Sequence, residues 1–323
     1  MPAMSDPLAF VRYHEAPLDW SKHNATAARA ALTTTLDLAA QRTLEAGARR
    51  FQPPRPLVAA INAALASRSP LLLTGDPGTG KTETAYYLAQ YFGLPPPYHF
   101  QVRSDSSARD LRYDFDAVAY LQDAYAKTIV TPTDGSDPRA QPRYLKPGKL
   151  WRAYEETGEC VLLIDEIDKA PRDFPNDLLQ ELSEQCFDHP FAAAPVRNQG
   201  PPPILIITSN GERSLPDPFL RRCVLCHIEL NDDLLRRILD AWDSAFAPRL
   251  PAGVRAAALP RFTEVRRLLR ERGRPPGAAE LLVWFNVLAV LQVPAATLAA
   301  APLAELPGIH SLIKLPEDYP LLG

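Results

Sequence analysis

The segment Gly75–Thr82, which reads GDPGTGKT, constrains this chain more than any other feature of its sequence. It matches the pattern G-x-x-x-x-G-K-[ST] and lies between an apolar run, 71–73, and a segment of helical composition, 82–92. Glycines let backbone N–H groups turn inward around phosphate oxygens, and the helix N-terminus adds a partial positive charge. The pattern predicts a nucleotide site in which Lys81 contacts the β- and γ-phosphates and the Thr82 hydroxyl binds Mg²⁺. The predicted phosphate-binding residues are Gly75, Asp76, Pro77, Gly78, Thr79, Gly80, Lys81 and Thr82.

Two adjacent carboxylates follow a second apolar run. Residues 161–164 predict a buried strand, and Asp165 and Glu166 come directly after it. Because ligands of parallel sheets bind at the carboxyl ends of the strands, we expect both acids to face the nucleotide. Asp165 is predicted to hold Mg²⁺, and Glu166 to orient and deprotonate the attacking water. Many strands end in acidic loops, so the pair has this meaning only together with the phosphate loop.

A third apolar run, 204–208, leads into Asn210. Its amide is placed to hydrogen-bond the attacking water or the γ-phosphate, although asparagine is also a common turn residue. Arg221 and Arg222 follow, the second of them twelve residues after Asn210. An arginine that meets a γ-phosphate stabilises the charge of phosphoryl transfer. Adjacent arginines also occur elsewhere in the chain, and such a pair can simply be a solvated surface feature. The position after Asn210 is what distinguishes Arg221 and Arg222.

Apolar strands that alternate with helices are typical of a parallel sheet covered on both faces. From Asn231 onward the pattern is helical only. We therefore predict an N-terminal helical extension (1–50), an α/β nucleotide-binding domain (51–230) and an α-helical lid domain (231–323). The predicted helices span 25–46, 57–66, 82–92, 118–127, 177–184, 232–242, 263–271 and 278–293, and the predicted strands span 71–73, 100–102, 161–164, 204–208 and 224–230.

Composition excludes several classes of protein. The chain has 35 Lys and Arg against 38 Asp and Glu, a net charge of −3, which argues against a dedicated nucleic-acid binder. The longest apolar stretch, 281–293, is too short to span a bilayer, and the N-terminus does not read as a signal peptide. Four cysteines form no disulfide framework, and the CxxC at 223–226 lacks a second ligand pair for zinc. We expect a cytoplasmic protein with no membrane partner.

Four motifs carry a resemblance to a known family. They read PLLLTGDPGTGKT (70–82), VLLIDEIDKA (161–170), TSN (208–210) and LPDPFLRRC (215–223). Over about residues 51–293 the chain resembles the AAA+ ATPases, and within them the MoxR-like branch. The resemblance implies a P-loop NTPase fold: a three-layer α/β sandwich with a five-stranded parallel sheet in the order 5-1-4-3-2, and a small all-α lid domain.

The resemblance also assigns roles to residues. Lys81 and Thr82 resemble the Walker A pair, and Asp165 and Glu166 the Walker B pair. Asn210 resembles sensor 1.

Two further roles concern arginines. Arg222 resembles the arginine finger, with Arg221 as the second candidate, and in this family the finger acts across a subunit interface. For the sensor 2 arginine of the lid only Arg274 is close to the expected place, and it precedes two prolines instead of following one. Residues 111–145 fall where this branch inserts extra elements into its second helix.

The family implies ATP and Mg²⁺ as cofactors, a homo-oligomer that is usually a hexamer, and a partner with a von Willebrand A-type domain. No residue reads the base, so ATP in place of GTP follows from the family alone. The first functional hypothesis is a chaperone-like remodelling ATPase. One alternative is a nucleic-acid-linked NTPase motor of the restriction type, which salt-dependent DNA binding would favour. The other is a slow regulatory nucleotide switch in a stress or conflict system, which slow turnover with tight nucleotide retention would favour.

Overall fold

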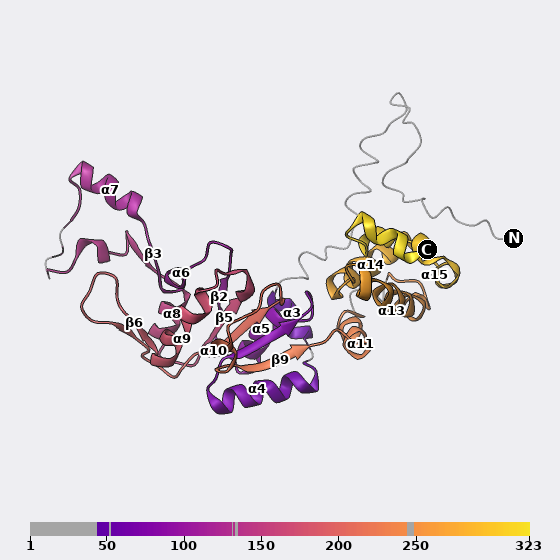
Figure 1. Ribbon diagram of the computed structural model, residues 1–323, viewed down its shortest axis with the longest axis horizontal. Coiled ribbons are helices and arrows are strands. Elements are labelled where there is room, and N and C mark those ends of the chain that lie inside the picture. Colours follow the sequence, from indigo (N-terminus) through magenta and orange to yellow (C-terminus); the bar gives the residue numbers. More distant parts are fainter. Residues whose placement is uncertain (1–43, 52, 131, 133–134, 244–248) are drawn as a thin grey trace, which may run out of the picture. The chain divides into compact units, whose positions relative to one another are not determined.

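The computed structural model describes residues 44–323, apart from 52, 131, 133–134 and 244–248 (Figure 1). The described residues divide into two compact units, 44–229 and 230–323. Most of the predicted N-terminal extension, including most of the helix expected at 25–46, lies outside the described residues. Its last seven residues form helix α3 (Leu44–Arg50), which packs against the helix that follows the phosphate loop.

A five-stranded parallel sheet forms the centre of the first unit. Across the sheet the strands are β2 (Tyr98–Gln101), β5 (Val161–Asp165), β8 (Ile204–Ser209), β1 (Leu71–Gly75) and β9 (Val224–Ile228). Numbered along the chain as strands of this sheet, that order reads 2-3-4-1-5, which confirms the expected order 5-1-4-3-2. Every residue of β5 is buried, so the sheet is covered on both faces. The predicted three-layer α/β sandwich is therefore present.

Helices on the two sides of the sheet complete the layers. They are α4 (Arg55–Ser67), α5 (Lys81–Tyr91), α8 (Lys149–Glu155), α9 (Phe174–Glu184) and α10 (Asp217–Leu220). α5 contacts β1, β5 and β8, and α4 contacts β1 and β9. Leu72, Leu162 and Ile207 share one core with residues of α8, α9 and α10. This packing buries the strands and leaves their carboxyl ends to the polar residues that follow them.

Extra elements interrupt the chain between β2 and α8. They are α6 (Ala108–Arg112), β3 (Tyr113–Phe115), α7 (Ala117–Ala126), the short turn η1 (Pro138–Ala140) and β4 (Leu145–Pro147). β3 and β4 pair antiparallel, and α7 matches the helix predicted at 118–127. The sequence did not predict this small sheet, nor the hairpin of β6 (Cys186–Phe187) and β7 (Val196–Arg197), because strands of two or three residues carry too few side chains to show a period.

The second unit consists of helices. They are α11 (Asp232–Ala241), α13 (Val254–Arg272), α14 (Ala278–Leu291) and α15 (Ala295–Ala300), followed by the 3₁₀ turns η3 (Leu303–Glu305), η4 (Ile309–Ser311) and η5 (Pro316–Leu322). No helix among the described residues is both long enough and apolar enough to cross a membrane.

α13 corrects the helix predicted at 263–271, because it starts nine residues earlier and runs through Pro260. A proline inside a helix costs about 3 kcal/mol, since it removes a hydrogen bond and clashes with the preceding turn. Ala258, Phe262 and Val265 are all completely buried. Their spacing gives the helix one continuous apolar face on both sides of the proline, and burial of that face offsets the cost.

An ion pair links the inserted elements to α9. Arg112 Nε lies 3.2 Å from Glu181 Oε1, and Glu181 is 8% exposed. Burial raises the pKa of Glu181 to about 7 although the guanidinium of Arg112 opposes the shift. Between about pH 4.5 and 7 the folded protein therefore keeps a proton on Glu181 that the unfolded chain has lost.

The stability that this proton binding contributes is present below about pH 4.5 and is lost as the pH rises through 7. We expect the free energy of unfolding to fall by roughly 1–3 kcal/mol between about pH 5 and 8 from this group. The Glu181→Gln variant should lack that part of the fall. Urea denaturation of both proteins across this range measures it, and parallel pH profiles would contradict the assignment.

Candidate functional site

The phosphate loop leaves the carboxyl end of β1 and enters α5. Gly75 and Gly80 have φ angles of 140° and 91°. A Cβ atom on Gly75 would lie 2.3 Å from the carbonyl oxygen of Ile228, and one on Gly80 would lie 2.4 Å from the ring of Phe51. The path of the loop thus requires glycine at both positions. α5 begins at Lys81, so the N–H groups of its first turn have no partner within the helix and face the loop.

Lys81 folds back onto this loop. Its ammonium donates to the carbonyl oxygens of Gly75 and Asp76 at 2.6 Å and 2.9 Å, and the residue is 6% exposed. Burial lowers the pKa of Lys81, while nearby carboxylates, Asp165 first among them, act in the opposite direction. A desolvated cation in a loop of N–H groups attracts anions far more strongly than an exposed one does.

Asp165, the last residue of β5, has three side-chain neighbours on its carboxylate. The hydroxyls of Thr82 and Thr208 donate to Oδ1 at 3.0 Å and 2.5 Å, and His99 Nε2 lies 3.2 Å from Oδ2. Burial by itself would raise the pKa of Asp165, but the hydrogen bonds from His99, Thr208 and Thr82 outweigh it and lower the pKa. An ionised carboxylate therefore lies beside the hydroxyl of the phosphate-loop threonine.

Glu166 has a left-handed backbone conformation, with φ 59°, which few residues other than glycine adopt. Its N–H donates to the hydroxyl of Thr208 at 2.8 Å, and this bond holds the turn. Its carboxylate accepts from Asn210 Nδ2 at 3.1 Å on one oxygen and from Gln101 Nε2 and Lys169 Nζ at 2.6 Å and 2.5 Å on the other. Two residues that were predicted separately for the site, Glu166 and Asn210, are thus in direct contact.

Asp168 fixes the backbone at Asn210 and so supports the contact between Asn210 and Glu166. It lies in the 3₁₀ turn η2 (Ile167–Lys169) and is 3% exposed. Its Oδ2 accepts from the backbone N–H groups of Asn210 at 3.1 Å and Glu212 at 2.9 Å. The turn after β8 is therefore fixed by a side chain that follows β5.

Five residues of the site were not predicted from the sequence: His99, Gln101, Asp168, Lys169 and Thr208. A signal was present for two of them: His99 and Gln101 are polar residues two apart on β2, on the face opposite Phe100, which stacks on Phe174. The prediction placed that strand at 100–102, which begins after His99. Alternation over the observed bounds of β2 would have directed both side chains toward the site.

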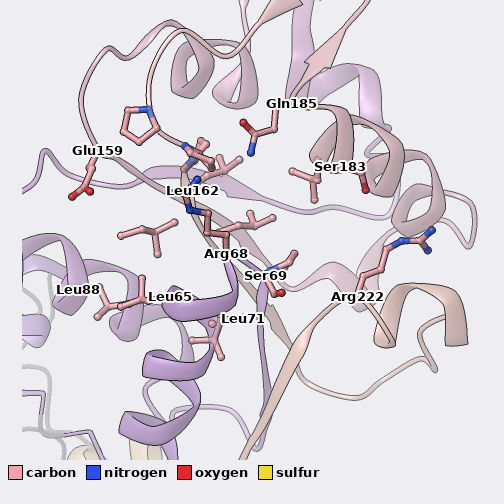
Figure 2. Close-up of a pocket in the computed structure, with 18 of the residues that line it drawn as sticks. Leu65, Arg68, Ser69, Leu71, Leu88, Glu159, Leu162, Ser183, Gln185 and Arg222 are labelled. Atoms are coloured by element: carbon pink, nitrogen blue, oxygen red, sulfur yellow. The ribbon is translucent and has the colours of Figure 1, made fainter.

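Arg221 and Arg222 do not join this cluster. β9 pairs with β1 along Leu71–Gly75, so residues before β9 lie beside the start of β1, whereas the phosphate loop lies beyond its end. The four residue-to-residue steps from Leu71 to Gly75 separate the two ends of β1 by about 13 Å. Both arginines line an open hollow of about 780 Å³ at this end of the sheet, and Figure 2 shows Arg222 on one side of it and Glu159 on the other. Arg222 is exposed and donates to the carbonyl of Pro218 at 3.1 Å.

Arg274 belongs to the second unit. It is exposed and follows α13, and its backbone N–H donates to Asp318 Oδ2 at 3.2 Å. Asp318 is 1% exposed and also lies against Gly273, where a Cβ would come within 2.5 Å of its Oδ1. The backbone at Arg274 is thus tied to the C-terminal turns of its own unit.

The residues at the carboxyl edge fit a magnesium nucleotide. The glycine loop and the buried ammonium of Lys81 match a polyphosphate, which offers several anionic oxygens to N–H donors. The Thr82 hydroxyl and the ionised Asp165 supply the oxygen ligands that Mg²⁺ prefers. Glu166 and Asn210 lie beside them with groups that accept and donate to a water molecule.

Residues 70–223 match the family described as AAA domain (dynein-related subfamily). A curated relative, the "ClpA homolog protein" of Fuscovulum blasticum, is 34% identical over 140 residues, which are 43% of this chain and 14% of that protein. The chain therefore spans about a seventh of the length of this relative.

Solved structures of NtrX from Brucella abortus are similar at low identity. The complex with ADP has a TM-score of 0.47 and 14% identity, and covers 89% of this chain and 60% of that one. The complex with ATP has a TM-score of 0.45 and 15% identity, and covers 90% of this chain and 64% of that one.

Proposed function

We propose that this chain, whose residues 70–223 match an AAA domain, is a Mg²⁺-dependent AAA+ ATPase that works as an oligomer. One observation carries the proposal: the hydroxyl of Thr82 contacts Asp165 at 3.0 Å, and Asn210 contacts Glu166 at 3.1 Å, at the sheet edge where the phosphate loop begins. Binding groups and hydrolytic groups thus share one edge.

Binding begins with the loop. The N–H groups of the loop and of the first turn of α5 donate to phosphate oxygens. When the nucleotide binds, the ammonium of Lys81 gives up its hydrogen bonds to the carbonyl oxygens of Gly75 and Asp76 and donates to the β- and γ-phosphates instead. Thr82 and Asp165 would hold Mg²⁺, which would supply positive charge against the phosphate oxygens.

Hydrolysis requires an oriented water. Glu166 accepts the proton of the water as it attacks. Asn210, which its hydrogen bond to Glu166 keeps beside that carboxylate, hydrogen-bonds the attacking water or the γ-phosphate. Gln101 and Lys169 keep the carboxylate of Glu166 in place from the other side.

The position of the arginines supports the proposed oligomer. An arginine finger must touch the γ-phosphate, and Arg222 lies at the opposite end of the sheet from the phosphate loop of its own unit. We therefore assign Arg222, with Arg221 as second candidate, to the nucleotide of a neighbouring subunit. The ring is proposed to be a hexamer, and Arg274 is proposed to act as sensor 2 from the lid domain.

The direct test is the release of phosphate from ATP by the purified chain. We expect turnover with Mg²⁺ and none above background after chelation with EDTA, because Thr82 and Asp165 then lack the ion that they hold. A parallel assay with GTP determines which nucleotide is used. No phosphate release with Mg²⁺ and either nucleotide would contradict the proposed activity.

Assembly provides a separate prediction. A nucleotide that touches two subunits favours the associated state by mass action. We expect ATP to convert the Glu166→Gln protein, which should retain ATP, into a larger species, measured by light scattering with ADP as the control. A mass that stays monomeric at saturating ATP and micromolar protein would contradict a nucleotide at the interface.

The cellular task is proposed from the MoxR-like resemblance: a cytoplasmic, chaperone-like remodelling of a protein client, with a von Willebrand A-type protein as partner. The Glu166→Gln form should hold ATP and so retain whatever the assembly engages. Affinity capture with this form, compared with Lys81→Ala, tests the task. Recovery of nucleic acid in place of protein would instead favour the restriction-type alternative.

A further inference from the structure

The imidazole of His99 lies between two polar side chains at the edge of the site. Its Nε2 is 3.2 Å from Asp165 Oδ2, and its Nδ1 is 3.1 Å from the hydroxyl of Tyr86. The His99 side chain is 23% exposed, and its ring meets that of Tyr86 edge to face. None of the steps proposed above uses either residue.

The chemistry of the three groups fixes the direction of the His99–Asp165 hydrogen bond and, for a neutral imidazole, of the Tyr86–His99 hydrogen bond as well. The ionised Asp165 can only accept, so His99 Nε2 must carry the proton that lies between them. In the neutral imidazole the other nitrogen then has a free electron pair, and Tyr86 donates its hydroxyl proton to Nδ1. The result is a chain of donors, from Tyr86 through His99 to Asp165, that ends on one carboxylate oxygen.

The secondary structure explains why these side chains meet. Thr82 and Tyr86 are four residues apart on α5 and so lie on one side of that helix. Thr82 contacts Asp165 directly, whereas Tyr86 reaches it through His99. One helix face therefore supports Asp165 at two points.

The two carboxylate oxygens of Asp165 share Thr82, which lies 3.0 Å from Oδ1 and 3.3 Å from Oδ2, but each has one further partner of its own. The hydroxyl of Thr208 holds Oδ1 at 2.5 Å. Oδ2 has His99 at 3.2 Å and Thr82 at 3.3 Å. Since the Thr82 oxygen is itself proposed to bind the metal, His99 is the donor that remains dedicated to Oδ2.

We propose that His99, oriented by Tyr86, is a positioning residue that holds the carboxylate of Asp165 for the Mg²⁺ ion of the nucleotide. The inference rests on the proposed function. Groups that orient a metal ligand change metal affinity or activity about 10–100-fold when they are removed. His99 should therefore affect how much Mg²⁺ the site needs, and leave the metal-free contacts of the phosphate loop unchanged.

The experiment measures binding of the analogue AMP-PNP as a function of Mg²⁺ concentration, by calorimetry, so that it does not depend on turnover. In the His99→Ala variant we expect the half-saturating Mg²⁺ concentration to rise about tenfold or more. Binding in EDTA should match that of the unmodified chain. His99→Gln should restore most of the Mg²⁺ response, because its amide can donate to Asp165, and Tyr86→Phe should give a smaller shift than His99→Ala.

The chain offers a matched control. His310 and Tyr319 form a second histidine–tyrosine hydrogen bond, which lies within the other unit, and neither residue is a predicted metal ligand. His310→Ala should leave the Mg²⁺ response unchanged, and thermal unfolding of each variant reports on the fold.

Two results would overturn the inference. The first is an unchanged Mg²⁺ requirement in His99→Ala. The second is an equal loss of affinity with and without Mg²⁺ that His99→Gln does not repair, which would mean that His99 only supports the local structure. If the unmodified chain binds no nucleotide under any condition, the proposed function itself fails, and this outcome is distinct from the other two.

Discussion

We expect the Lys81→Ala variant to lose ATP binding, and the Glu166→Gln variant to bind ATP without hydrolysing it. The two residues act at different stages. The buried ammonium of Lys81 already lies on the loop that receives the phosphates, so its interaction with them is made in the ground state. Glu166 is needed when the water loses its proton, and removal of such a base costs about 10²–10⁴ in rate.

The Glu166→Gln substitution changes the charge and little of the shape. Its amide oxygen can still accept from Asn210, so the turn after β5 should persist. Nucleotide binding by calorimetry and phosphate release separate the two stages. Lys146→Ala and Glu271→Gln, both at exposed positions, are matched controls and should behave as the unmodified chain.

Two results would contradict these roles. Hydrolysis by Glu166→Gln at a near-normal rate would mean that another group takes the proton. Retained tight binding by Lys81→Ala would mean that the phosphates bind elsewhere.

Arg222→Ala should nearly abolish ATP hydrolysis while nucleotide binding remains, because an arginine finger raises the rate of hydrolysis about 10³–10⁵-fold. A mixture of two inactive proteins tests whether the arginine acts on a neighbour. The Lys81→Ala subunit has a defective pocket but still presents Arg222. The Arg222→Ala subunit has an intact pocket and no finger to lend.

In a random one-to-one mixture about a quarter of the head-to-tail interfaces join an intact pocket to an intact arginine. We therefore expect ATPase activity to return on mixing, measured as phosphate release against each variant alone. If Arg222 acted within its own subunit, no pairing could repair either site and the mixture would stay inactive. Arg221→Ala, assayed in the same way, shows which arginine of the pair has the role.

Much of the fold and part of the site could be predicted from local patterns. The phosphate loop was recognisable because its chemistry needs glycines, lysine and threonine at fixed spacing within one segment. β5 was recognisable because a strand buried on both faces is apolar throughout. The carboxylates could be placed because they follow that strand directly.

The remaining site residues come from segments that only the folded sheet brings together. Gln101 reaches Glu166 across 65 positions of the chain because β2 and β5 are neighbours. Asp168 holds the turn at Asn210 because β5 and β8 are neighbours as well. Alternation along β2 could direct Gln101 toward the site, but the partners of Gln101 and Asp168 depend on which strands are neighbours, and no spacing rule gives that.

The sequence by itself determined the parts whose physics is local: the phosphate loop, the buried strands and the acids that end β5. Only the tertiary structure decided which side chains surround those acids and where the arginines lie. His99 became a neighbour of Asp165 through the pairing of β2 with β5 and the packing of α5 on the sheet. Arg222 is separated from its own phosphate loop because β9 runs parallel to β1. Such contacts depend on strand order and register, and those are set by the burial of the whole core rather than by any one segment.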